Sequence, residues 1–149
     1  MKEQTELTSR INDLIETLKD GQEGFKQAAE GVKDPQLKSL FTDYSLQRSR
    51  FATELQSEAR VLGESKPETS SSTAGALHRA WINLKSAVTS GDDRAILAEC
   101  ERGEDSAVEE YQKAMNDNLS ASLRGIVARQ FAQIKEAHDR IKNLRDTTK

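Results

Sequence analysis

Apolar residues recur at three- and four-residue steps along four long stretches of this chain, and few structures besides the α-helix bury such a pattern. The stretches cover about residues 2–33, 35–62, 93–115 and 119–145. Because each helix would carry its apolar side chains in one stripe, the stripes must be buried against one another. The sequence therefore predicts an all-α protein built from four long helices.

Short polar breaks separate these stretches. Asp34 is placed to accept hydrogen bonds at the start of the second helix, and Pro35 suits the first helical position. Residues 90–92 (Ser-Gly-Asp) and 116–118 (Asn-Asp-Asn) are typical of turns. Since the connections within the first and second pairs of long helices are short, each pair is predicted to form an antiparallel hairpin.

The middle connection is much longer. Residues 63–73 form a polar, Ser- and Thr-rich loop, and a short helix is predicted at about residues 74–88. Two helical hairpins joined by one long crossover form the ferritin-like topology. We therefore predict one domain over residues 1–149, a ferritin-like antiparallel four-helix bundle. A simple up-down bundle with an extra capping helix is the alternative, and the sequence alone does not separate the two.

The short helix has its own apolar stripe, with side chains at i, i+4, i+7 and i+11. These are Leu77, Trp81, Leu84 and Val88. If the helix lies outside the bundle, the stripe is a candidate interface for a second protein or an apolar ligand. If it packs on its own chain, which we favour, the stripe belongs to the core.

Polar residues interrupt the apolar stripes near the middle of the long helices. Glu104 interrupts the third helix, Gln130 the fourth, and Gln47 and Arg48 the second; on the first helix the break is Gly21 and Gln22. A buried carboxylate must be paired or hydrogen-bonded, so Arg48 is predicted to neutralise Glu104, with Gln47 and Gln130 as donors. We favour a buried polar layer that sets the helix register. A metal or ligand pocket between the helices is the alternative.

Four segments resemble a bacterial family of ferritin-like four-helix-bundle proteins of unknown function. They read LIETLKDGQEGFKQAAE, HRAWINLKSAV, ECERGEDSAVEEYQKAM and IKEAHDRIKNLRD. The resemblance covers nearly the whole chain in the same order. It implies a ferritin-like bundle with a loose link to bacterial stress response, and it implies no established activity.

The ferritin-like resemblance also bears on metal binding. Di-iron members of that superfamily use one Glu on each of two helices and Glu-x-x-His on each of the other two. Of the matching positions only Glu104 and His138 are ligands here, since the others read Leu18, Gln47 and Lys135. A di-iron centre needs carboxylates to offset the metal charge. No cofactor is therefore expected, and iron or manganese at a degenerate site of Glu104 and His138 is the alternative.

Composition excludes several other classes of protein. The single cysteine, Cys100, cannot form an internal disulfide and is interpreted as a small buried apolar residue. One cysteine and two histidines do not make a Cys/His zinc site, and His78 is predicted to lie at the surface. The net charge of -3 and the interleaved charges disfavour nucleic-acid binding. No apolar run predicts a membrane span or a secretory leader, so the chain is predicted to be cytoplasmic.

No phosphate-binding loop, nucleotide fingerprint or nucleophile–base motif stands in the sequence. We therefore predict a non-enzymatic, stress-associated bundle protein that acts as a homo-oligomer or by binding a protein partner. The alternative is a metal-dependent ferritin-like oxidoreductase or a metal-storage protein. A third hypothesis is a small apolar ligand bound in a cavity between the hairpins, lined by Leu18, Tyr44, Tyr111 and Ile134.

Overall fold

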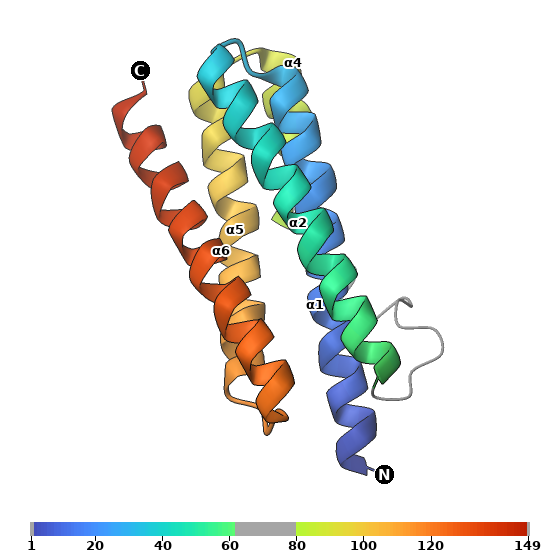
Figure 1. Ribbon diagram of the computed structural model, residues 1–149. Helices are drawn as coiled ribbons and strands as arrows, with labels where there is room; N and C mark the ends of the chain where they lie inside the picture. The colour runs from blue at the N-terminus through green and yellow to red at the C-terminus, as the bar shows by residue number, and fades with distance from the viewer. Residues whose placement is uncertain (1, 62–79, 149) are drawn as a thin grey trace.

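The computed structural model describes the backbone of residues 2–61 and 80–148, and the side chains of residues 9–61 and 80–148. Every regular element in this part of the chain is an α-helix, which confirms the all-α prediction (Figure 1). The helices are α1 (Lys2–Gly31), α2 (Pro35–Val61), α4 (Leu84–Ser90), α5 (Asp93–Met115) and α6 (Ala121–Thr147).

The helix ends follow the polar breaks seen in the sequence. The Asp34 carboxylate accepts a hydrogen bond from the Gln36 backbone N–H at 2.8 Å, and α2 begins at Pro35. Asp92 caps α5 in the same way, and the left-handed φ of 69° at Gly91 ends α4. Helix α6 begins two residues later than predicted, because Ser120 is its N-cap and accepts from the Leu123 N–H.

The four long helices form two antiparallel hairpins that lie side by side, α1 with α2 and α5 with α6 (Figure 1). Helix α1 packs along α5, and the Arg10 Nε atom near its start lies 2.6 Å from the Asp117 Oδ2 atom just past the end of α5. At the other end of the bundle, the Asp93 carboxylate accepts hydrogen bonds from the backbone N–H groups of Lys33 and Asp34. Helices α2 and α5 therefore run in the same direction, which requires one long crossover between the hairpins and is not the simple up-down order.

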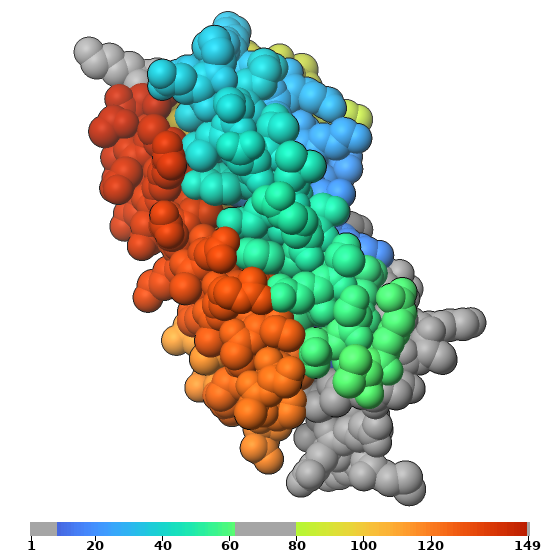
Figure 2. Space-filling view, in the orientation of Figure 1, coloured from blue at the N-terminus to red at the C-terminus, as the bar shows by residue number. Residues whose placement is uncertain are grey.

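Helices α2 and α6 form the remaining side of the bundle. In the space-filling view their side chains meet along one face (Figure 2). Polar contacts join them there, including a hydrogen bond of 3.2 Å from the Gln47 amide to the Gln133 carbonyl and an ion pair between Arg129 and Glu54. The described helices thus make a helical bundle, and none of them is both long and apolar enough to cross a membrane.

The apolar core has two halves, each built from all four long helices. Ile11, Leu55, Tyr111 and Val127 belong to the first half. The second half contains Phe25, Phe41, Leu97 and Ile141, and it also holds Cys100, which is fully buried as predicted. On α2 and α5, respectively, Arg48 and Glu104 lie between the residues of one half and those of the other. The core is therefore divided by charged side chains near the middle of the bundle.

The crossover returns to the bundle at Trp81. A continuous helix was predicted over about residues 74–88, but Trp81–Asn83 form a turn and α4 begins only at Leu84. The Trp81 ring contacts the Phe25 ring, with centroids 5.3 Å apart. It also lies so close to Gly24 and Gly103 that a Cβ atom at either glycine would overlap the indole.

The candidate interface of the short helix faces its own bundle in the described residues. Leu84 is buried, and Val88 lies against Gly31, where an added Cβ would be 2.7 Å from the valine side chain. With Trp81 between α1 and α5, three of the four stripe residues contact their own chain. The fourth, Leu77, and the predicted loop over residues 63–73 lie outside the described residues.

Candidate functional site

Arg48 on α2 and Glu104 on α5 form a two-point ion pair inside the bundle. The Arg48 Nη1 atom lies 2.5 Å from Glu104 Oε1, and Nη2 lies 2.8 Å from Oε2. The exposed fractions of the two side chains are 1% and 0%. This paired geometry is the strong form of the interaction between arginine and carboxylate.

The surroundings of Arg48 explain the polar breaks on α1 and α2. Arg48 Nε donates to the side-chain carbonyl of Gln47 at 3.1 Å, and the Arg48 Cζ atom lies 5.2 Å from the centre of the Phe25 ring. On α1, a Cβ at Gly21 would lie 3.6 Å from Arg48 Nη1, so a longer side chain there would crowd the guanidinium. Burial lowers the pKa of Arg48, but the charge and hydrogen bonds of Glu104 raise it more, and the net shift is upward. Arg48 therefore stays protonated.

Gln130 lies apart from this ion pair and belongs to a second polar cluster. The Tyr111 hydroxyl donates to the side-chain carbonyl of Gln130 at 2.7 Å. The side-chain amide of Gln130 donates to the Glu54 carboxylate at 2.8 Å and to the backbone carbonyl of Phe51 at 3.3 Å. Burial raises the pKa of the Tyr111 hydroxyl, which keeps it a donor. The prediction that Gln47 and Gln130 donate to Glu104 is wrong for both residues, since the Gln47 amide donates to Gln133. Gln130 is paired with Tyr111 instead, because a buried tyrosine hydroxyl needs a hydrogen-bond acceptor.

Cys100 is not placed for catalysis. Burial raises the pKa of its thiol well above the ordinary value, and the nearby charges of Glu104 and Glu99 raise it further. A thiol held in the neutral form is a poor nucleophile and a poor metal ligand.

Glu104 and His138, the two residues named for the alternative metal site, have different partners in the structure. Both carboxylate oxygens of Glu104 are taken by Arg48. The His138 ring faces Asp105 instead, with Nε2 2.5 Å from the Asp105 Oδ1 atom. Consecutive residues of an α-helix point to different faces. Glu104 therefore lies in the core and contacts Arg48, whereas Asp105, the next residue, lies at the surface and contacts His138.

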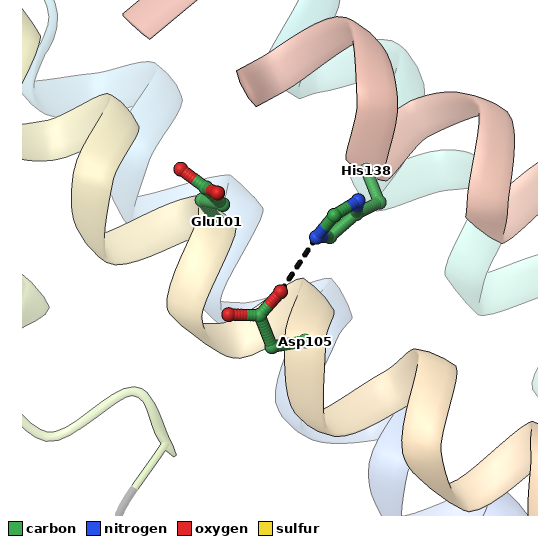
Figure 3. Close-up of side chains that lie close together, drawn as sticks. All are labelled: Glu101, Asp105 and His138. Carbon is green, nitrogen blue, oxygen red and sulfur yellow. Dashed lines mark hydrogen bonds and ion pairs between the residues drawn. The ribbon is translucent and has the colours of Figure 1, made fainter.

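His138 instead belongs to a group with two carboxylates of α5 (Figure 3). Glu101, Asp105 and His138 each offer one ligand atom, and these atoms all lie within 4.8 Å of one another. One cation and one further carboxylate adjoin the group: Arg145 pairs with Glu101, and the His138 Nδ1 atom lies 3.1 Å from Asp139. Partial burial lowers the pKa of His138, while hydrogen bonds to Asp139 and Asp105 raise it more, so the net shift is upward.

Glu101 and Asp105 were not predicted as site residues. They lie four residues apart on α5, which puts both carboxylates on one face of the helix. This spacing was the feature of the sequence that could have indicated the two residues. In a chain this rich in acidic residues, however, the same spacing is common on solvent-exposed helix faces. Only the packing of α6 against α5 brings His138 to these two residues.

The residues proposed to line an apolar cavity are packed in the core. Leu18, Tyr111 and Ile134 belong to the first half of the core, whereas Tyr44 packs against Phe25 in the second, with ring centroids 5.3 Å apart. The four side chains are thus divided between the two halves.

Comparison with known proteins gives a family and no activity. None of the curated proteins matches the sequence significantly. A family model described as a domain of unknown function, DUF2383, matches residues 6–117, which include most of α1, all of α2, α4 and α5, and the residues Arg48 and Glu104. The chain therefore belongs to the DUF2383 family.

Proposed function

We propose that the protein is a single-domain, ferritin-like bundle without enzymatic activity, which acts in the bacterial cytoplasm by self-association or by binding a protein partner under stress. The observation that carries this proposal is the buried ion pair of Arg48 and Glu104. A ferritin-like oxidoreductase would hold its metal ligands on the facing sides of these helices. Arginine stays protonated, so its guanidinium supplies a permanent positive charge there in place of a metal ion.

The neighbouring polar groups support the same proposal. Tyr111 and Gln130 hydrogen-bond to each other, and Gln130 reaches outward to Glu54. These contacts satisfy polar atoms within the bundle and join α5, α6 and α2. A satisfied polar cluster of this kind specifies the packing of helices.

A protein that acts by association needs anchors at its surface. Large apolar side chains are exposed at three described positions, with exposed fractions of 54% for Leu46, 67% for Ile82 and 77% for Val61. Apolar anchors surrounded by charged residues are typical of protein contacts. Ile82 follows Trp81, whose ring is held between α1 and α5, so this anchor would be presented on a fixed backbone.

Sedimentation of the full-length protein over a wide concentration range tests the proposal. We expect dimers or larger assemblies, and we expect Ile82→Ser or Leu46→Ser to weaken association by about tenfold or more. Ser39→Ala, an exposed polar position on α2, is the matched control and should leave association unchanged. A protein that stays monomeric at every concentration and binds no purified candidate partner would contradict the proposal.

The alternative is a metal-dependent oxidoreductase or storage protein that uses Glu104 and His138. It has less support, because Arg48 occupies Glu104 and His138 contacts Asp105. Metal analysis of protein expressed with iron and manganese, beside the Glu104→Ala variant, separates the two. Stoichiometric iron or manganese that the variant loses would favour the oxidoreductase.

A further inference from the structure

We propose that Glu101, Asp105 and His138 bind one divalent transition-metal ion, with zinc as the representative ion, at the junction of α5 and α6. Their ligand atoms lie within 4.8 Å of one another (Figure 3). The site is separate from the ion pair of Arg48 and Glu104, and it does not depend on self-association.

The two helices hold the three donors with different degrees of constraint. The exposed fractions of the Glu101 and His138 side chains are 12% and 19%, so packing restricts both. Asp105 is 62% exposed, so its side chain is the least restricted of the three by packing. In a tetrahedral site with bonds of about 2.1 Å, ligand atoms are about 3.4 Å apart. Binding one ion would therefore bring the three ligand atoms closer by at most about 1.4 Å, and the exposed Asp105 side chain has the most room to move.

The charge and chemistry of the donors suit a first-row transition ion. Two carboxylates balance the charge of a divalent cation, and imidazole favours zinc or iron over magnesium or calcium. Three protein ligands leave a fourth position for water or another small ligand. We therefore expect zinc to bind and the hard ions to bind far more weakly.

A second carboxylate orients His138 as in known metal sites. The Nδ1 atom lies 3.1 Å from the Asp139 carboxylate, and Nε2 faces Asp105. With Nε2 bound to a metal ion, Nδ1 would carry the ring proton and donate it to Asp139. Histidines that bind metals commonly donate their other ring N–H to a carboxylate, which sets the tautomer and the ring orientation. In the metal-free protein Nε2 contacts Asp105 directly, and a bound ion would lie between the two.

Arg145 competes with the metal for Glu101. Its guanidinium pairs with Glu101 and also lies 3.0 Å from Asp146, so it has a second carboxylate to move to when a cation arrives. Its side chain is 30% exposed, which lets it move into solvent. This competition would lower metal affinity, and removing the arginine would raise it.

Calorimetric titration of zinc chloride into the metal-free, full-length protein tests the site. We expect one zinc ion per chain. Asp105→Asn and His138→Gln should each weaken binding by at least about tenfold, since each removes one of three ligands. Asp139→Asn should weaken binding less, and Arg145→Gln should strengthen it. Because Asp105 is exposed, its variant reports on binding even if His138→Gln does not fold.

The second histidine of the chain supplies the matched control. His78→Gln should bind zinc like the unaltered protein, because His78 is not part of the proposed site. Failure to bind one zinc per chain, or equal binding by Asp105→Asn, would overturn the proposal. Sedimentation of the same variants should be unchanged, so loss of the metal site and loss of self-association can be told apart.

Discussion

Arg48 and Glu104 are buried side chains of opposite charge, and each is costly to bury without the other. Glu104→Gln leaves the Arg48 guanidinium without a countercharge in the core. We expect this change to lower the free energy of unfolding by about 3–5 kcal/mol, measured by urea denaturation. Glu109→Gln, an exposed position on the same helix, should change it by no more than about 0.5 kcal/mol.

A double variant separates the value of the ion pair from the cost of breaking it. In Arg48→Met with Glu104→Leu, apolar side chains of similar size replace both charges. Such replacements are often neutral or stabilising by about 1–4 kcal/mol. A Glu104→Gln variant as stable as the unaltered protein would show that water or another group satisfies Arg48, contrary to the geometry described above.

His138 gives the metal-free protein a stability that depends on pH. Its folded-state pKa lies above the ordinary 6.5, because Asp139 and Asp105 outweigh the effect of burial; Glu101 and Arg145 also lie nearby. Protonated His138 therefore stabilises the fold below pH 6.5, and this contribution is lost as the pH rises through the raised pKa.

The difference in unfolding free energy between the unaltered protein and His138→Gln should accordingly be larger at about pH 5.5 than at about pH 8.5. Denaturation with urea in the presence of a chelator measures it. The opposite trend, or none, would mean that His138 lies away from its carboxylate partners in solution.

At the scale of elements, the approach of the crossover to α1 and α5 depends on two glycines. Gly24 and Gly103 leave space for the Trp81 ring, and a methyl group at either would overlap it. We expect Gly103→Ala to destabilise the fold by about 1–3 kcal/mol, as overpacked cores do, and to shift the Trp81 fluorescence towards that of exposed tryptophan.

Gly125→Ala is the matched control for this prediction. Gly125 is exposed on α6, and a Cβ there would contact nothing within 4 Å. Alanine is the better helix former, so this change should stabilise the protein by about 0.5–1 kcal/mol. If Gly103→Ala behaved like Gly125→Ala, the Trp81 ring would not occupy the space between α1 and α5.

At the scale of the whole molecule, the two halves of the core should unfold together. Each half draws side chains from all four long helices, and each long helix runs through both halves. Loss of one half would therefore leave every helix without half of its packing. We expect urea transitions followed by Trp81 fluorescence and by far-ultraviolet circular dichroism to coincide. A fluorescence transition at lower urea would instead mean that the second half of the core, against which Trp81 packs, unfolds first.

The contacts of the candidate site were harder to predict than the helices that carry them. Arg48 was identified as the countercharge of Glu104, because a carboxylate in an apolar stripe needs a cation and few cations lie inward. His138 was assigned to Glu104, yet it contacts Asp105, the next residue on the same helix. A shift of one residue turns a helical side chain by about 100°, and sequence spacing does not show which of two neighbours faces the partner helix.

The sequence by itself determined the four long helices, the cap at Asp34 and the two hairpins, because these depend on residues close along the chain. It also placed polar residues inside the stripes. Only the tertiary structure decided that Trp81 lies between α1 and α5, and that α6 brings His138 to Glu101 and Asp105. Such contacts join residues far apart in sequence, and they depend on the rotation of each helix about its axis, which the packing of all four helices sets together.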